Sequence, residues 1–483
     1  MSATPLAHRA ALPALLFALV WLSCAWFGSW PFNDNQATRL YAAIALVEEG
    51  RASIDDYAPL TIDKARFGDH HYLDKAPGMT LLAAPAVAAL GRFDGDRARD
   101  HPLSRGDYWF GRYLRSRLWL TTALGSAVLT ALGAVALFAL ARDAIGSTGG
   151  GLVAALGYAL GTPAWGWSTT LFGHAPVAAL YAIAAWAVWR GTQARASPGH
   201  ALLAGVALGG AVLIEYQAVL AGAVIGLWAL WRLRGRDGAG VAILAALAGA
   251  LPAAAALIGY NLIAFGQPFR IGYAGVVGWD GMRQGLFGLT YPKPLVLLEL
   301  LIGSRRGLLW VAPVLLLAPA GLAGLIAARR TRDLGVMAAA GAATVLLVNA
   351  AYVYWDGGFS TGPRHSLPAV PLLALGLGAL WAARPRWRAG IALLLLLSIA
   401  LNLAIAATDI FAPDDKPFPI WDPVLGVALP AGRFDDWPSV WLYWRPWQGM
   451  VLYLTLALPL AALLLVAARL RARPNIYRTD GAA

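Results

Sequence analysis

Two residues of opposite charge stand near the ends of one polar segment early in the chain. Asp34 follows an apolar run that ends near Trp30, and Lys75 lies in the run HHYLDKAPG, before a second apolar run that begins at Pro77. A carboxylate can take a proton from a hydroxyl group, and an ammonium can bind an anionic oxygen. If both apolar runs cross a membrane, this acid and this lysine share one membrane face. That combination is expected where a charged lipid is processed at the bilayer surface.

The composition is that of a membrane protein. The chain is 59% hydrophobic and 13% charged, with a mean hydropathy of +0.59, and its apolar runs reach membrane-spanning length. We predict one all-α, polytopic membrane domain over residues 1–483, with about 12 to 13 transmembrane helices. The larger number applies if residues 201–231 form two half-helices that meet at Glu215. The apolar runs lie near residues 12–30, 78–91, 118–140, 149–164, 175–189, 201–231, 241–263, 308–327, 335–352, 367–382, 389–408 and 448–468.

The net charge of +12 is explained by where the arginines lie along the chain. Arginines gather at the ends of apolar runs, near residues 232–236, 329–332, 384–388 and 469–478, as expected of cytoplasmic loops. The basic balance therefore indicates lipid headgroups as partners, and nucleic acid is not expected. This threading leaves residues 31–77, 264–306, 353–366 and 409–447 on the outer face. Arg190 and Arg195 leave the orientation of residues 91–232 open, and the single Cys24 excludes an internal disulfide.

The outer segment 31–77 is patterned beyond what a connector needs. Residues 36–49 can form an amphipathic helix with Leu40 and Tyr41 on its apolar face and Arg39 off it, lying along the membrane interface. Asp34 can cap this helix, and Gly50 can end it. A capping role and a chemical role for Asp34 are both consistent with the pattern.

The stretch WPFNDNQATRLYAAIALVEEGRASIDDY, continued by FGDHHYLDKAPG, resembles the first periplasmic loop of C-type glycosyltransferases. By pattern it is most similar to lipid A aminoarabinose transferases and protein O-mannosyltransferases. In this resemblance Asp34 matches the first acid of an acidic pair, Tyr41 the helix aromatic, and Lys75 the lysine of a lysine-proline run. The chain departs from the pattern at Asn35, which replaces the second acid, and at Ala76, which replaces a proline.

The resemblance implies the transfer of a sugar from a polyprenyl-phosphate carrier to an extracytoplasmic acceptor: a lipid, a glycan or a protein. Asp34 is then the candidate general base, and Lys75 binds the departing phosphate. Asp55 and Asp56 are alternative bases, ligands for a divalent cation, or solvated loop acids. Adjacent His70 and His71 lack the spacing of a metal site. The metal requirement, and so any cofactor, stays open.

Other charged residues join this candidate site. The run YVYWDGGFSTGPRHSLP supplies Arg364 as a second phosphate-binding cation. Arg305 lies on the outer face against the positive-inside trend, and it is a further candidate for the donor phosphate unless it pairs with acidic residues of the outer loops. Glu215 interrupts an apolar run, where an ionisable side chain is costly unless it lines a polar cavity. The substrate cavity is predicted to include six residues: Tyr41, His71, Tyr72, Glu215, Asp356 and His365.

Two functions fit these features. The first is the glycosyltransferase, integral to the cytoplasmic (inner) membrane, with a periplasmic active site and a lipid-linked sugar donor. The second is a transporter or flippase of a lipid-linked saccharide, which would also need outer cations and an intramembrane acid. A transporter is expected to show internal repeats and several polar residues at mid-membrane, which the sequence lacks apart from Glu215. No phosphate-binding glycine loop occurs between a strand and a helix, so cytosolic nucleotide use is disfavoured.

Overall fold

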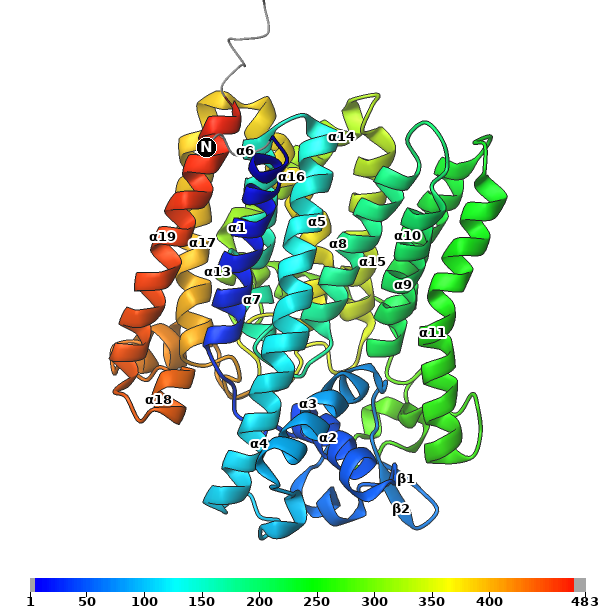
Figure 1. The fold of residues 1–483 in the computed structure, drawn as a ribbon, viewed down its shortest axis with the longest axis vertical. Helices are drawn as coiled ribbons and strands as arrows, with labels where there is room; N and C mark the ends of the chain where they lie inside the picture. The colour runs from blue at the N-terminus through cyan, green and yellow to red at the C-terminus, as the bar shows by residue number, and fades with distance from the viewer. Residues whose placement is uncertain (1–4, 473–483) are drawn as a thin grey trace, which may run out of the picture.

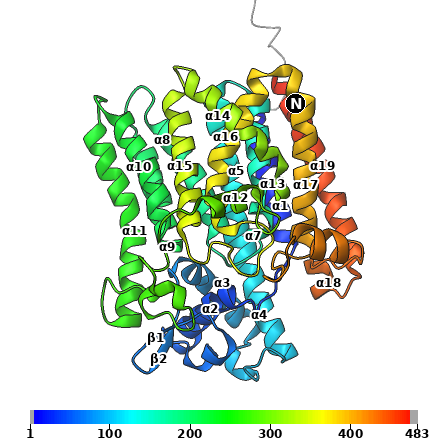
Figure 2. The same cartoon turned by 180° about the vertical axis from the view of Figure 1, so that it is seen from behind.

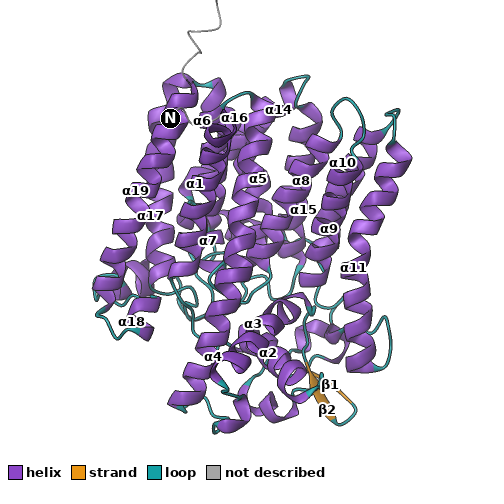
Figure 3. Cartoon of the chain, viewed as in Figure 1, coloured by secondary structure: helices purple, strands orange, loops and turns teal. Residues whose placement is uncertain are grey.

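The computed structural model describes residues 5–472, and the regular structure in them is helical apart from one short two-stranded hairpin, which confirms the all-α polytopic prediction (Figure 3). Helices and strands, apart from short 3-10 and π turns, are α1 (Pro5–Trp26), α2 (Asp34–Ile44), β1 (Ala65–Phe67), β2 (His70–Tyr72), α3 (Gly78–Asp94), α4 (Tyr108–Thr121), α5 (Ala127–Ile145), α6 (Thr148–Ala159), α7 (Ala164–Trp167), α8 (His174–Gly191), α9 (Pro198–Ile214), α10 (Ala218–Leu233), α11 (Ala239–Phe265), α12 (Pro294–Ile302), α13 (Leu308–Val311), α14 (Ala318–Ala327), α15 (Arg332–Ala351), α16 (Val370–Ala383), α17 (Arg388–Ala407), α18 (Trp437–Trp441) and α19 (Pro446–Ala472).

The apolar helices differ in length. Within residues 5–472, six helical stretches are long and apolar enough to cross a membrane, and shorter apolar helices accompany them. The six are Tyr108–Ile145, Ala239–Phe265, Arg332–Ala351, Arg364–Ala383, Pro385–Ala407 and Pro446–Leu470. The shorter ones are Ala11–Trp26, Pro198–Ile214, Ala218–Leu233 and Pro313–Ala327. The predicted set of spans therefore combines full-length helices with shorter segments.

The long helices stand side by side in one bundle, with a smaller helical layer below it (Figures 1 and 2). The arginine-rich turns lie at the upper end of Figure 1, here called the arginine end. The smaller layer and the long loops lie at the opposite end, here called the loop end. The last arginine cluster extends to Arg473 and Arg478, which lie outside the described residues.

Contacts between turns settle the orientation of residues 91–232. The Arg232 guanidinium donates to the Thr192 hydroxyl at 2.6 Å, so the turn after α8 lies beside the turn after α10. Arg190 pairs with Asp143 at 3.3 Å, and Arg330 donates to the Asp143 carbonyl at 3.1 Å. Arg190, in the last turn of α8, and the turn that follows it therefore lie at the arginine end. This follows because residues 201–231 are two antiparallel helices, α9 and α10, joined at residues 215–217.

Residues 27–107 remain together at the loop end. They contain α2, the β1–β2 hairpin, in which Arg66 pairs with His71, and α3. The apolar run 78–91 was expected to be the second span, but it forms α3, which lies beside α2 below the long helices in both views. The α3 helix packs against α2 and α4, and Met79, Ala83 and Val87 are buried, whereas Phe93 near its end is 89% exposed. The return to the arginine end begins only at α4.

The helix predicted over residues 36–49 exists, and it is buried on more sides than its pattern suggested. It runs as α2 and a π-helical turn (Ala45–Glu49), and it ends at Gly50, which is left-handed with φ of 68°. Arg39 was expected off the apolar face, yet it is 1% exposed. The preceding residue, Asn33, is the N-cap, so Asp34 does not cap the helix. The α2 helix is therefore the core of the loop-end layer.

Candidate functional site

Charged side chains from separate parts of the chain meet at the loop end of the bundle. The Lys75 ammonium donates to Asp63 Oδ2 at 2.9 Å and to Asp74 Oδ2 at 2.6 Å. Arg39 Nη2 lies 2.9 Å from Glu215 Oε1, at the joint between α9 and α10. These five side chains, here called the buried charge cluster, are between 2% and 13% exposed. Each buried charge in these two groups has a partner, as such charges require.

Backbone packing holds the segment that carries three of these charges. Ala65 forms a bridge with Val276, which joins the first outer loop to the loop after α11. A Cβ added at Gly272 would lie 2.6 Å from the Leu73 carbonyl oxygen, and one at Gly78 would lie equally close to a backbone carbonyl oxygen at the end of α9. Only glycine allows these approaches. The outer loop is thus pressed onto the bundle at Lys75.

A third cation lies beside the cluster. Arg364 begins a short 3-10 helix (Arg364–Ala369) that leads into α16. Its Cζ atom lies 4.5 Å from the centre of the Phe172 ring, and the Arg39 Cζ atom lies 5.6 Å from the same centre. Arg364 differs from the other two cations because it makes no hydrogen bond or ion pair with any residue between 5 and 472, and its Nε atom is buried. Its guanidinium is therefore available to an anion.

The two acids that hold Lys75 have opposite pKa shifts. Burial raises the pKa of Asp63, but Lys75, and after it Arg364 and Arg39, outweigh this effect, so the pKa lies below its usual value. Burial raises the pKa of Asp74, and the Lys75 charge does not offset it. One carboxyl oxygen of Asp74, Oδ1, is buried without a hydrogen-bond partner in the described chain. Asp63 is therefore the fixed counter-ion, and Asp74 is the acid that gains a proton more easily.

A cavity opens next to these charges. Its polar lining comprises His174, Glu215, Asn349, Tyr352 and His365. The rings of His174 and His365 have centroids 4.7 Å apart, and those of His365 and Tyr352 5.5 Å apart. The remaining lining is largely apolar and comes mainly from α8, α10 and α15: Val177, Tyr181, Ala218, Leu220, Ala221, Val345 and Val348, among others. Such a cavity has one end suited to a polar group and walls suited to a hydrocarbon.

Several predicted residues come together here and others do not. Lys75, Glu215, Arg364 and His365 belong to the cluster or to the cavity beside it. Asp34 lies apart from them: its Oδ1 atom accepts from the Ile62 amide at 3.0 Å and pairs with Arg105. Its side chain is 23% exposed.

The other predicted residues are bound into the loop layer. Asp56 pairs with Arg51 and is 63% exposed. Two more pairs hold the loops: His71 Nδ1 lies 3.5 Å from Asp55, and Arg305 lies 2.7 Å from Asp356. The Tyr41 ring stacks on Tyr57 at 5.1 Å between centroids, and Tyr72 packs edge-on against Phe265 at 5.4 Å. These side chains have structural contacts and do not line the cavity described above.

Arg39, Asp63 and Asp74 were not predicted as site residues, and no chemical role was predicted for His174. Asp74 directly precedes Lys75, so the dipeptide was a signal that this lysine carries its own counter-ion. Asp63 and Arg39 had no such signal, because only the folded loop brings them to the cluster. Between residues 5 and 472, no group of three or more His, Cys, Asp or Glu side chains is arranged to hold a metal ion.

Comparisons with known proteins give likenesses of structure only. No protein-family model matches the chain, and no curated protein matches it. A structure of ArnT from Cupriavidus metallidurans bound to undecaprenyl phosphate is similar with a TM-score of 0.48, 15% identity, and coverage of 96% of this chain and 75% of that one. The same protein in its apo state is similar with a TM-score of 0.48 and 16% identity, over 96% of this chain and 73% of that one. The oligosaccharyltransferase AglB from Archaeoglobus fulgidus, in complex with an inhibitory peptide and a dolichol-phosphate, is similar with a TM-score of 0.46 and 13% identity. The similarity covers 85% of this chain and 56% of that one.

Proposed function

We propose that the chain is a membrane glycosyltransferase that moves a sugar from a polyprenyl-phosphate carrier to an acceptor at the loop end. The observation that carries the proposal is Arg364, a partly buried arginine whose Nε atom is buried without a partner in the described chain, next to a cavity with one polar end and apolar walls. A phosphate attached to a long hydrocarbon matches both features. On this proposal the loop end faces the periplasm and the arginine end the cytoplasm, as the arginine-rich turns favour.

The carrier phosphate is placed against Arg364, with the imidazole of His365 beside it. A guanidinium offers a planar set of donors that suits phosphate oxygens. The prenyl chain then extends between α8, α10 and α15, along the apolar lining of the cavity. Lys75 is a second phosphate ligand only after it leaves one of its two carboxylates. Arg305, paired with Asp356, is placed nearer the acceptor side of the loops.

The reaction needs a base for the acceptor hydroxyl. The hydroxyl oxygen bonds to the anomeric carbon, the bond from that carbon to the phosphate oxygen breaks, and the hydroxyl proton passes to a carboxylate. Asp34 suits this step because its Oδ1 atom is anchored, and Oδ2 has no partner in the described chain. Asp74 is the second candidate, with its raised pKa and free Oδ1 atom. Asp56 is less suited because its side chain is 63% exposed, against 23% for Asp34.

The test is to replace Arg364 by methionine and, in a second variant, by lysine. Arg433 is the matched control, because it is an exposed arginine of the loop end that makes no side-chain hydrogen bond or ion pair in the described chain. Binding of farnesyl phosphate to the detergent-solubilised chain is measured by calorimetry. Loss of hydrogen bonds to a charged group is expected to weaken binding roughly tenfold or more for Arg364→Met, less for Arg364→Lys, and not at all for Arg433→Met.

The measurement is repeated with farnesol, which lacks the phosphate. Farnesol is expected to bind wild type and Arg364→Met equally. Equal affinity of all the variants for farnesyl phosphate would remove Arg364 from the donor site. If the chain instead moves the intact sugar-linked carrier across vesicle membranes without removing the sugar, the chain is a transporter and not a transferase.

A further inference from the structure

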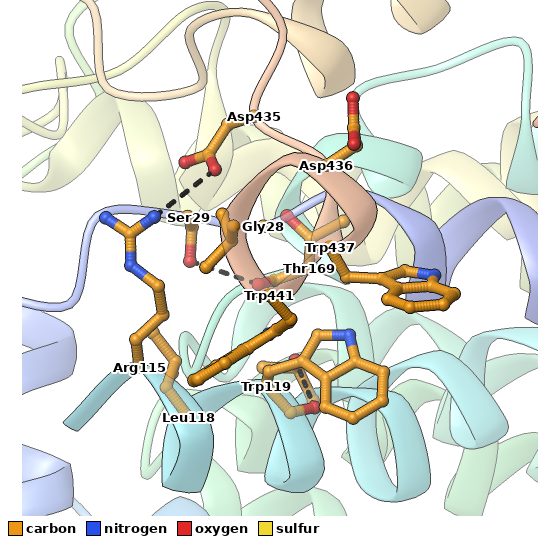
Figure 4. Close-up of a pocket in the computed structure, with 12 residues that line it drawn as sticks. Gly28, Ser29, Arg115, Leu118, Trp119, Thr169, Asp435, Asp436, Trp437 and Trp441 are labelled. Carbon is orange, nitrogen blue, oxygen red and sulfur yellow. Dashed lines mark hydrogen bonds and ion pairs between the residues drawn. The ribbon is translucent and has the colours of Figure 1, made fainter. Parts of the chain in front are cut away.

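A second pocket lies at the loop end, on the other side of the segment that carries Phe172. It is lined by α4, by the chain between α1 and α2, and by α18 with the two aspartates before it. Figure 4 shows the indole rings of Trp119, Trp437 and Trp441 around it, with Arg115 and Asp435 at its edge. None of the residues used so far in the proposed reaction lines this pocket.

The polar groups of this pocket are incompletely partnered. Arg115 Nη1 and Asp435 Oδ1 are 3.5 Å apart, a loose ion pair in which both side chains are about one third exposed, 34% and 35%. Asp436 is fully buried; its Oδ1 atom accepts from the Ser439 amide at 2.9 Å. Its Oδ2 atom has no hydrogen-bond partner in the described chain. Such a carboxylate has spare capacity for a hydroxyl donor.

The indole rings are held in place by contacts outside the pocket. Trp119 donates to the Ala25 carbonyl at 3.1 Å, and Trp437 packs edge-on against Trp26 at 5.5 Å between centroids. Arg112 stacks on the Trp441 ring at 4.7 Å. The rings are therefore a pre-formed apolar platform, which costs little entropy to use in binding.

Trp119 and Trp437 are tilted by 40° to each other, so each presents its own apolar face. Apolar indole faces beside carboxylates and an arginine have the chemistry of saccharide recognition. The C–H face of a pyranose ring is apolar and packs on an indole, while its hydroxyl groups donate to carboxylates and accept from a guanidinium. We propose that this pocket binds a sugar ring of the acceptor. This inference rests on the proposed function, because only a transferase has an acceptor. It deepens that function by naming a glycan as the acceptor class.

The two sites are close enough to act on one reaction. Thr169 lines the pocket, and Phe172, three residues later, contacts both Arg39 and Arg364. Three residues span at most roughly 10 Å of extended chain. Ser29, also in the pocket lining, donates to the Thr169 carbonyl at 3.1 Å and so ties the pocket to this segment. A sugar bound here would be a near neighbour of the carrier phosphate.

Saturation-transfer NMR on the full-length chain in detergent tests the site, with methyl glucoside, methyl galactoside and methyl mannoside as probes and sorbitol as a polyol without a ring. Ring protons of at least one glycoside are expected to receive saturation, and sorbitol is expected to receive none. Trp441→Ala is expected to weaken binding roughly two- to tenfold, and Asp435→Asn roughly tenfold. Trp447, exposed and outside the lining, supplies the control Trp447→Ala, which is expected to bind as wild type.

Signals that persist unchanged in both pocket variants would overturn the proposal, and so would competition by a phosphoethanolamine lipid headgroup stronger than by any glycoside. Farnesyl phosphate binding separates this inference from the proposed function. Trp441→Ala should leave that binding intact. If Arg364→Met has no effect on the carrier while Trp441→Ala abolishes the glycoside signal, the proposed reaction fails and the saccharide site stands.

Discussion

The pair between Arg39 and Glu215 offers a direct test of the buried charge cluster. Their atoms are 2.9 Å apart, and the two side chains are 2% and 13% exposed. Removing one partner of a buried pair leaves the other charge uncompensated, at a cost of about 3 to 5 kcal/mol. Arg39 keeps a bond to the Asn35 carbonyl at 3.1 Å. Glu215→Gln is therefore expected near the lower end of that range, about 3 kcal/mol.

The assay is reversible unfolding in mixed micelles, with and without farnesyl phosphate. Glu215→Gln leaves Arg39 and Arg364 as two cations on the faces of one ring, Phe172, so an anion that binds there should recover part of the lost free energy. The phosphate is expected to stabilise Glu215→Gln more than wild type. The double variant Arg39→Met with Glu215→Gln should be more stable than Glu215→Gln alone. A single variant as stable as wild type, or equal stabilisation of both by the phosphate, would refute this account of the cluster.

Three further outcomes follow from the loop layer. Gly78→Ala should push the loop away from α9 and lower the free energy of unfolding by about 1 to 3 kcal/mol, because its Cβ would lie 2.6 Å from a backbone oxygen. The control is Gly91→Ala, whose Cβ would lie 3.8 Å from its nearest neighbour, and it should leave stability unchanged in the same unfolding assay. Asp63 has a lowered folded pKa, so its contribution to stability is present above its unfolded pKa of about 3.9 and is lost as the pH falls through the folded value. Asp63→Asn should remove this part of the pH dependence in acid unfolding curves. Asp34→Asn and Asp74→Asn should separate the candidate bases: the variant that lowers turnover with unchanged farnesyl phosphate affinity lacks the base, and loss of that affinity instead would indicate a structural role.

The helical architecture was predictable because lipid forces a strong pattern on sequence. Apolar runs of spanning length predicted the long helices, and the arginines at the ends of these runs predicted which turns share the arginine end of the bundle. The run 78–91 was mistaken for a span, because hydropathy alone cannot distinguish a helix of the bundle from α3, one side of which packs on α2 and α4 in the loop-end layer. Glu215 marked the joint of α9 and α10, since an acid in an apolar run requires a break or a partner, and it has both.

The candidate site was predictable only where one residue type carried the signal. Lys75 and Arg364 stood out as cations on outer loops. Lys75 belongs to the buried charge cluster, and Arg364 lies beside it. Their roles differ for a reason outside the local sequence: Lys75 is neutralised by two carboxylates, one of them Asp63, and Arg364 is not. Asp34 drew attention through its position after the first helix, yet pairing with Arg105, far along the chain, turns one of its oxygens away from the cluster. Long-range pairing of this kind leaves no local pattern.

The two carboxylates on Lys75 would let the cluster respond to the proposed transfer reaction. With every group ionised, Arg39, Lys75 and Arg364 are balanced by Asp63, Asp74 and Glu215, so a carrier phosphate adds negative charge to a neutral set. If Asp74 receives the acceptor proton, its charge disappears and Lys75 keeps only Asp63 at 2.9 Å. The ammonium is then free to turn toward the phosphate, which gains negative charge in the same step because its bond to the sugar breaks. Proton uptake at one carboxylate would thus strengthen the binding of the leaving group. Asp34 as base, paired with Arg105 instead, has no such connection to Lys75.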